Sequence, residues 1–430
     1  MDAELQGALF ACKHPHIHVA DSLQMADRAV AMAQAGARAI LVAGVDFMSE
    51  NVRAVLDHAG FAQLPVYRLA TEPIGCSLAE SAERPAYTAF LHEAARTPRS
   101  LHVVYINTSL RLKARAHALV PTITCTSSNV VQTLLQAAAQ VPDVHIWYGP
   151  DTYMGENLRT LLTAWSGRPD ADVRTLHPNH DAASLRALLQ RFHPFQQGVC
   201  IVHHLFGASV ADRVRREHGD DLLAAHLEVP GEMFALAAAA QLQGRGVVGS
   251  TSNILDFIGR HVDAALATPR PATVRVVLGT EAGMITSIVR KVQDKLRAGG
   301  RDDVEVEVVF PVAAEAVAAA PGTELGVVPG AAQGEGCSVA GGCATCPYMK
   351  KNSLDALFDV LGDLAAGRVR LDRLKPQMGG APVAGRSVAE AGSVPIVAMR
   401  EFQRTGRLPD GLVADVMGRR AGDAPVPSPP

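Results

Sequence analysis

The sequence predicts an α/β protein built on parallel sheets, because apolar runs and amphipathic segments alternate along its 430 residues. A chain of this length suits two to four domains. Two of the amphipathic segments are SLQMADRAVAMAQAG and SNVVQTLLQAAAQ, which carry apolar residues at helical spacing. Apolar runs rich in valine and isoleucine suit strands buried on both faces of a parallel sheet, and their alternation with helices predicts right-handed crossovers. The runs expected to form strands are ARAILVAGVDF, LHVVYINTS, DVHIWYGPD, FQQGVCIVHHLF, GRGVVGSTSN, TVRVVLGTEAG and VEVEVVFPV.

Polar residues gather where the expected strands end. They lie at positions 46–50, 107–109, 126–129 and 250–253, and at Thr280 and Glu281. Ligands of open α/β sheets bind outside the carboxyl ends of the strands. We therefore expect many strand ends to converge on one site.

Charge and hydropathy exclude some classes of partner. The formal net charge is −3, which argues against nucleic acid or an anionic membrane as the main partner. No apolar run approaches the roughly 20 residues of a membrane span. The first residues, MDAELQGALFACKHPH, lack the basic-then-apolar order of a signal peptide. From these features we expect a soluble, cytoplasmic protein.

Seven cysteines, an odd number, argue for metal ligation or buried thiols rather than a disulfide framework. Three of them, Cys337, Cys343 and Cys346, lie within ten residues in the glycine-rich segment GEGCSVAGGCATCPYMK. Glycines let a backbone wrap closely around a cluster, and a proline after the last cysteine is found in iron–sulfur loops. Zinc would want four nitrogen or sulfur ligands at short spacing. The segment by itself leaves an iron–sulfur cluster, a zinc knuckle and redox or structural thiols open.

Cys76 and Cys200 stand in turns near expected strands, in IGCSLAES and GVCIVHHLF. With Cys346 they divide the chain into three blocks, each with a cysteine in a glycine-containing loop. Three cysteines from distant loops can hold three irons of a cubane and leave the fourth iron open as a Lewis acid. Each cysteine alone would also suit a buried apolar thiol, the interpretation we adopt for Cys12 and Cys125.

His203, His204, His226 and Glu228 are further candidates. In HLEVPGE, His226 and Glu228 are two residues apart and share a side of an extended segment, which suits general acid/base work. A hydrogen-bonded buried histidine and an N-cap glutamate form the structural alternative.

Three turns, in VVGSTSN, VLGTEAGM and TCTSSNVV, place hydroxyl residues before a helix. Free N–H groups and hydroxyls at a helix start can bind carboxylate or phosphate, although such a turn can equally be a simple N-cap. Glycine motifs for dinucleotides or nucleoside triphosphates are not found. Several such turns together favour a multiply anionic ligand.

Ordered motifs throughout the chain resemble the quinolinate synthase family, in its longer plastid-type form. They are DSLQMADRAV, GVDFMSENVRA, IGCSLAES, YINTS, PTITCTSSNVVQT, WYGPDTYMG, GVCIVHHLFG, HLEVPGE, GVVGSTSNILDFI, LGTEAGM and GEGCSVAGGCATCPYMK. The resemblance implies three similar α/β/α domains with parallel sheets around a pseudo-three-fold axis. We expect them at residues 1–95, 96–190 and 191–352, followed by a helical extension and disordered tail at 353–430.

The resemblance also implies a [4Fe-4S] cluster ligated by Cys76, Cys200 and Cys346, which leaves Cys337 and Cys343 as a disulfide or free thiols. The implied reaction condenses iminoaspartate with dihydroxyacetone phosphate, with loss of phosphate and two waters, to form quinolinate for NAD biosynthesis. L-aspartate oxidase would act upstream, and iron–sulfur assembly machinery would supply the cluster.

Site residues carried over by motif fall into two groups. The catalytic group is Glu228, Tyr105, His203 and His226. The substrate-binding group is Ser22, Phe47, Met48, Asn107, Ser127, Ser250 and Thr251. Glu228, with Tyr105 near it, is the expected general acid/base, and the hydroxyls and His226 offer donors to carboxylates or a phosphate.

One departure concerns the N-terminus. Family members carry a strand with a His-x-Tyr motif just before the segment that here reads MDAELQGAL. Either the start is placed too far downstream or the strand is missing. If it is missing, we expect weak or no activity, and the alternative function is a catalytically impaired iron–sulfur paralogue. We also expect a low-complexity loop at 313–336.

Overall fold

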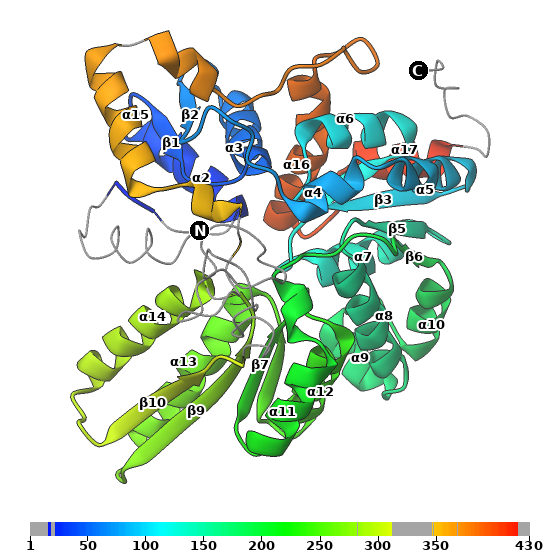
Figure 1. Ribbon diagram of the computed structural model, residues 1–430. Coiled ribbons are helices and arrows are strands. Elements are labelled where there is room, and N and C mark those ends of the chain that lie inside the picture. The colour runs from blue at the N-terminus through cyan, green and yellow to red at the C-terminus, as the bar shows by residue number, and fades with distance from the viewer. Residues whose placement is uncertain are drawn as a thin grey trace, which may run out of the picture. The chain divides into compact units, whose positions relative to one another are not determined.

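A computed structural model describes residues 16–18, 22–281, 283–311, 346, 348–367 and 369–419 (Figure 1). The described residues fall into two compact units. The N-terminal unit combines residues from Pro15–Val199 with the C-terminal helices of Leu354–Pro430, and the central unit spans Cys200–Ser353. Cys12, Cys337, Cys343, the expected loop at 313–336 and the tail lie outside the described residues.

The N-terminal unit begins with a two-stranded parallel sheet, in which Val42 of one strand pairs with Arg68 of the other. Its elements are α2 (Ser22–Gln34), β1 (Ile40–Val42), α3 (Asp46–His58), β2 (Val66–Arg68) and α4 (Ser77–Ala82). Helix α4 begins directly after Cys76, which is its N-cap residue. One of the expected cluster ligands therefore lies at the end of the connection between β2 and α4.

A second sheet of the same unit has four parallel strands in the order β4-β3-β5-β6. Its strands are β3 (Ser100–Tyr105), β4 (Thr122–Cys125), β5 (His145–Gly149) and β6 (Phe192–Pro194). Its helices are α5 (Pro85–Arg96), α6 (Leu110–Leu119), α7 (Val130–Gln140), α8 (Thr152–Ser166), α9 (Asp170–Leu176) and α10 (Ala182–Gln190). Strand β3 is buried along its whole length, as expected for a strand covered on both faces.

The central unit holds another four-stranded parallel sheet, in the order β10-β9-β7-β8. Its strands are β7 (Leu222–His226), β8 (Gly246–Gly249), β9 (Ala272–Gly279) and β10 (Val304–Val309). Its helices are η1 (His203–Phe206), α11 (Ala208–Glu217), α12 (Gly231–Leu242), α13 (Thr251–Ala267), α14 (Gly283–Gly299) and η3 (Met349–Lys351). Apolar side chains of α13 and α14 pack against β7 and β9 to form the core on one face, among them Phe257, Ile288 and Val276.

Both four-stranded sheets share one topology. Numbered from their own first strand, each has the order 2-1-3-4, and the direction of the crossovers reverses after the second strand. Because crossovers are right-handed, this reversal places the first connecting helix on one face and the later ones on the other. Figure 1 shows this in the central unit, where α12 and the pair α13 and α14 lie on opposite sides of the strands. In sheets of this kind the ligand crevice forms at the reversal, between the first and third strands.

The C-terminal helices cover the N-terminal unit. They are α15 (Leu354–Ala366), η4 (Val369–Leu374), α16 (Val388–Thr405) and α17 (Asp410–Gly418). Val360 of α15 and Leu374 of η4 are buried against Tyr67 and Leu69 at the end of β2. Helix α16 lies so close to α6 that a Cβ on Gly392 would overlap the carbonyl oxygen of Leu110.

The α/β class with parallel sheets is confirmed, whereas the four domain ranges stay a prediction. The two quoted amphipathic segments form α2 and α7, and six of the seven expected strand runs contain a strand. The run FQQGVCIVHHLF is the error, because its described residues form a loop followed by η1. No described helix combines the length and the apolar character that a bilayer span requires.

A tight backbone contact explains why FQQGVCIVHHLF leaves the sheet. The N–H of Gly198 donates to Thr152 Oγ1 at 3.0 Å, and the N–H of Thr152 donates to the Gly198 carbonyl at 2.7 Å. These bonds replace a strand ladder. A Cβ at Gly198 would overlap the carbonyl oxygen of Pro150 and lie 2.9 Å from Ser81 Oγ. Glycine is therefore required on the segment that leads to Cys200.

Gly198→Ala is expected to lower the free energy of unfolding by about 1–3 kcal/mol, because the added methyl group forces the backbone apart. Gly167→Ala is the matched control, since a Cβ there would meet nothing closer than the Ala164 carbonyl at 3.6 Å. Urea unfolding followed by circular dichroism compares the two. Equal midpoints for both variants would contradict the close approach.

A buried histidine makes the second sheet sensitive to acid. His102 is fully buried in β3, with Nε2 2.9 Å from the Tyr87 hydroxyl and Nδ1 3.3 Å from Thr122 Oγ1. Thr122 donates its own hydroxyl proton to the Val120 carbonyl, so neutral His102 carries its proton on Nδ1. Burial lowers the pKa of His102 from 6.5 to about 3.

The pKa of His102 is lower in the folded protein than in the unfolded chain. The full contribution of the neutral ring to the free energy of unfolding is therefore present above pH 6.5 and is lost as the pH falls towards 3. Between pH 6.5 and 4.5 His102 should remove about 2–3 kcal/mol from the free energy of unfolding. In His102→Gln that part of the pH dependence disappears, while replacing the exposed His58 by glutamine leaves it intact. Parallel slopes for the wild type and the His102 variant in pH-dependent urea titrations would refute the assignment.

Candidate functional site

Three strand ends of the central unit meet at one edge. His226 of β7 pairs with Gly249 of β8, and Ala225 of β7 pairs with Gly279 of β9, so the carboxyl ends of the three strands are level. The residues that follow these strands are polar and largely buried: Glu228, Ser250 and Thr280. This edge includes the reversal of strand order between β7 and β9, which is where a doubly wound sheet binds its ligand.

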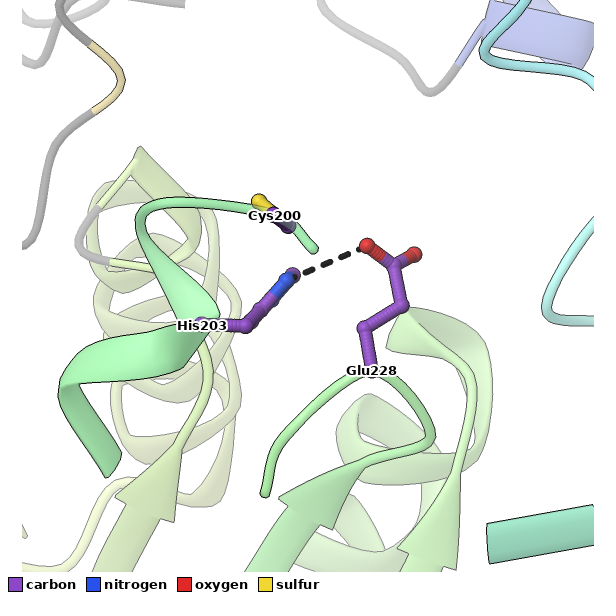
Figure 2. Close-up of side chains that lie close together, drawn as sticks. All are labelled: Cys200, His203 and Glu228. Atoms are coloured by element: carbon purple, nitrogen blue, oxygen red, sulfur yellow. Dashed lines mark ion pairs between the residues drawn. The ribbon is translucent and has the colours of Figure 1, made fainter. Parts of the chain in front are cut away.

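Cys200, His203 and Glu228 form a compact group at this edge (Figure 2). One ligand atom from each residue lies within 4.8 Å of the others. Cys200 stands in the loop after Gly198, and its carbonyl accepts the N–H of His204 as the chain turns into η1. Figure 2 shows the thiol of Cys200 above the His203 ring, with the Glu228 carboxylate facing both. A thiol, an imidazole and a carboxylate at this separation suit a metal ion.

The carboxylate of Glu228 contacts two imidazole rings. Its Oε2 is 3.1 Å from Nδ1 of His203, and its Oε1 is 3.7 Å from Nδ1 of His226. The two rings stack at 5.3 Å with an interplanar angle of 8°. The contact with His203 is close enough for an ion pair, although Nδ1 is not aligned for a hydrogen bond. All three side chains are buried, so water screens these interactions weakly.

The two histidines respond to this environment in opposite directions. Burial lowers the pKa of both rings. At His203 the charges of Cys200 and Glu228 outweigh burial and hold the pKa well above its usual value. At His226 burial prevails, and the neighbouring His203 adds to it, so the pKa falls to about 4. Near neutral pH the site therefore pairs a cationic imidazole with a neutral one.

A backbone hydrogen bond beside Glu228 supports the neutral state of His226. The N–H of Glu228 donates to Nδ1 of His226 at 3.4 Å, so neutral His226 carries its proton on Nε2. The N–H of Leu227 donates to the Gly249 carbonyl at 3.0 Å and extends the ladder with β8. The N-cap of α12 is Pro230, so the N-cap interpretation of Glu228 was wrong.

Ser250 and Thr251 begin α13 at the same edge. Ser250 is the N-cap, and it forms a capping box in which its hydroxyl accepts the N–H of Asn253 at 3.4 Å and its own N–H donates to Asn253 Oδ1 at 2.9 Å. Thr251 Oγ1 lies 3.4 Å from the sulfur of Met284. Ser250 therefore serves as a helix N-cap, which was the structural alternative for such turns. A substrate-binding role for Ser250 or Thr251 stays a prediction.

Cys346 belongs to the same unit as Cys200. Burial, together with the charges of Glu281 and Cys200, raises the pKa of the Cys346 thiol to about 12. The thiol therefore lies within electrostatic range of both groups. A metal ion would reverse this tendency by stabilising the thiolate.

Tyr105, Asn107 and Ser127 gather at the equivalent edge of the second sheet. Tyr105 ends β3 and pairs with Cys125, the last residue of β4, so the turns after both strands are adjacent. Asn107 and Ser127 lie in those turns and are half-buried. Cys125 itself is fully buried in β4, as expected for a packing residue.

Cys76, Ser22, Phe47 and Met48 accompany the two-stranded sheet. Ser22 begins α2, and Phe47 and Met48 lie in the first turn of α3, with Ser22 and Phe47 buried. The half-buried Cys76 follows a loop that is fixed by a buried ion pair. Arg68 lies 2.6 Å from Asp46 and also donates to the carbonyls of residues 71 and 72.

Sequence reasoning missed two features of the site. It assigned Cys200 to one role and His203 with Glu228 to another, whereas the structure gathers all three as possible ligands of one ion. It also gave no role to Glu281, whose charge acts on Cys346. Local spacing carries no signal for the contact of Glu228 with Cys200 and His203 or for that of Glu281 with Cys346, because each joins segments that are distant in the sequence.

Comparison with known proteins relates residues 13–379 to the family described as quinolinate synthetase A protein. Two chloroplastic quinolinate synthases, from Nicotiana tabacum and Oryza sativa subsp. japonica, are each 51% identical over 97% of this chain. The chain spans only 60% and 62% of their respective lengths. A quinolinate synthase from Methanopyrus kandleri is 29% identical over 64% of the chain and 72% of its own length.

These plant relatives overturn the expected location. Their names place them in chloroplasts, so the prediction of a cytoplasmic protein was wrong. Composition and net charge describe the folded domains, which look alike in both compartments, and could not have distinguished them. With a family model that covers most of its length and relatives at 51% identity, the chain belongs to the quinolinate synthetase A family.

Proposed function

We propose that the protein is a quinolinate synthase, which condenses iminoaspartate with dihydroxyacetone phosphate to form quinolinate. The observation that carries the proposal is the group of Cys200, His203 and Glu228 at a sheet edge, in a chain of this family. The reaction requires proton transfers on substrates that carry two carboxylates and a phosphate. A buried carboxylate beside one cationic and one neutral imidazole offers both an acid and a base for such transfers.

The proposed cofactor is a [4Fe-4S] cluster held by Cys76, Cys200 and Cys346. The charge of Cys200 raises the pKa of the Cys346 thiol, and this proximity within the central unit supports a shared metal centre. When bound, a cluster with one iron not ligated by protein supplies a Lewis-acid position for a substrate oxygen.

The chain's own residues take distinct roles in this proposal. Glu228 accepts a proton from the substrate carbon, and cationic His203 stabilises the carboxylate and returns a proton to a departing oxygen. Neutral His226 presents its Nε2–H to an anionic group, and Tyr105 assists the proton shifts. The substrate-binding residues are Ser22, Phe47, Met48, Asn107, Ser127, Ser250 and Thr251.

The organisation and partners complete the proposal. Three domains are proposed at 1–95, 96–190 and 191–352, of which the first would contribute Cys76 and the third both Cys200 and Cys346. Iminoaspartate would come from L-aspartate oxidase, and iron–sulfur assembly machinery would load the cluster. Nucleic acid and membranes are not expected partners.

A second candidate rests on the same group of residues. A cysteine, a histidine and a glutamate within 4.8 Å also suit a single zinc ion with one open position. The protein would then bind metal without forming quinolinate. Zinc would require Cys200 with His203 and Glu228, whereas a cluster requires the three cysteines.

Replacement of each cysteine separates the two candidates. In anaerobically reconstituted protein, Cys76→Ala, Cys200→Ala and Cys346→Ala should each lose most of the iron and sulfide, expected at about four per chain for one cubane, and all quinolinate formation. Cys125→Ala, which removes a buried thiol of β4, is the control and should keep both the iron and sulfide content and the quinolinate formation. Iron, sulfide and zinc are measured by elemental and colorimetric analysis. Zinc at one per chain, unaffected by Cys76→Ala, would support the second candidate instead.

Glu228→Gln is expected to lower kcat about 10²–10⁴-fold, because the amide fills the same space but cannot accept a proton. The iron content should stay unchanged. The exposed Glu232, on the first turn of α12, provides the matched control Glu232→Gln, for which wild-type kcat is expected. Anaerobic turnover with both substrates gives the comparison. A Glu228→Gln enzyme with more than half of the wild-type kcat would remove Glu228 from the mechanism.

A further inference from the structure

Lys113 of α6 is a fully buried lysine to which the proposed reaction assigns no role. Its side chain has no solvent exposure. Its Nζ donates to the carbonyl oxygen of Ile106 at 3.1 Å and to the carbonyl oxygen of Thr108. An apolar side chain of similar size would fill the same space without the loss of hydration that a buried ammonium suffers. A lysine at this position therefore indicates a specific task.

The two acceptors bracket Asn107. Ile106 and Thr108 stand on either side of it, in the turn that follows β3. A hydrogen bond from this turn to β4 also holds it, because the N–H of Ile106 donates to the Cys125 carbonyl at 2.9 Å. It is also closed on itself, because Thr108 donates its hydroxyl to the Tyr105 carbonyl at 2.9 Å. Lys113 thus fixes the peptide groups on both sides of Asn107.

Glu50 of α3 extends this arrangement to a second element. Its Oε2 accepts the N–H of Leu110, the first residue of α6, at 2.8 Å. Glu50 is itself buried, and the negative charge of its ionised form favours the cationic form of Lys113. Helix α3 also carries Phe47 and Met48, which we assigned to substrate binding. One buried charge network thus joins α3 to the turn that carries Asn107.

We propose that Lys113 is a positioning residue: its ammonium group, held by the carbonyls of Ile106 and Thr108, fixes the turn that presents Asn107 to the substrate. The inference rests on the proposed function, because it takes Asn107 as a substrate-binding residue. Burial lowers the pKa of Lys113 to about 7, partly offset by Glu50 and Cys125, yet either protonation state retains enough N–H groups for both carbonyls.

The test replaces Lys113 by methionine, which keeps the length of the side chain and removes its donors. In the reconstituted holoenzyme, Lys113→Met should raise the KM for dihydroxyacetone phosphate or iminoaspartate at least tenfold, with iron content unchanged. Amide hydrogen exchange of residues 106–110 should accelerate at least tenfold. Arg111→Ala is the matched control on the same helix, because Arg111 is more than half exposed and pairs with Glu83. Arg111→Ala should change neither the KM nor the exchange rate of residues 106–110.

A second variant guards against a folding defect. Lys113→Gln retains a polar head that can donate to one carbonyl, and it should give an intermediate KM and an intermediate exchange rate. Folded variants with wild-type KM and wild-type exchange would overturn the proposal. Failure of both variants to fold would also overturn it, since Lys113 would then serve the fold rather than the turn.

The exchange measurement separates this inference from the proposed function. If the wild-type holoenzyme makes no quinolinate, the proposed function fails, whereas exchange of residues 106–110 still tests whether Lys113 holds the turn. If the wild type is active and Lys113→Met exchanges faster with unchanged KM, the turn is held by Lys113 but does not serve the substrate, and the inference is wrong.

Discussion

Parallel strands bring their carboxyl ends to one edge of a sheet, and the order of the strands decides where along that edge a ligand can enter. Both four-stranded sheets have the order 2-1-3-4, so the connections that leave the adjacent first and third strands run in opposite directions. The turns after β3 and β7 stand beside this divergence. Asn107 follows one of these strands and Glu228 follows the other, so the placement of both candidate residues depends on this single topological constraint.

At the edge of the central sheet, the stacked rings of His203 and His226 beside Glu228 take opposite protonation states. His203 receives the attraction of both Glu228 and Cys200, and this outweighs the penalty of burial. His226 receives attraction from Glu228 alone and repulsion from His203, so burial prevails. The charge of Cys200, which raises the pKa of His203 alone, and the shorter distance of His203 from the carboxylate, 3.1 against 3.7 Å, thus give the two rings different protonation states. Such divergence between neighbouring titratable groups is typical of acid/base sites.

The sequence was informative wherever a local pattern determines the structure. Helical periodicity predicted α2 and α7, and buried apolar runs predicted β3 and β5. The spacing in HLEVPGE predicted that His226 and Glu228 share a side, and their side chains do approach. The strands β2, β6 and β7 were missed. Strands β2 and β6 have only three residues each, and the five-residue apolar segment of β7 was not among the expected runs.

Non-local contacts were beyond reach of these patterns. The run around Cys200 is apolar enough for a strand, and only the approach of Gly198 to Pro150 shows why it forms a loop. The association of Cys200 with His203 and Glu228 likewise depends on how that loop meets β7. Such contacts arise from packing of distant segments, for which one sequence gives no periodic signal.

Buried polar groups in this protein divide by position. In the middle of β3, His102 is kept neutral, and each of its ring nitrogens has a partner, as a core requires. Near the ends of β3 and β7, by contrast, two ionisable side chains are buried, Lys113 of α6 and Glu228. Apolar residues would serve packing better at both places. That two sheets of the same topology each retain such a group after their first strand argues that the constraint there is chemical rather than structural.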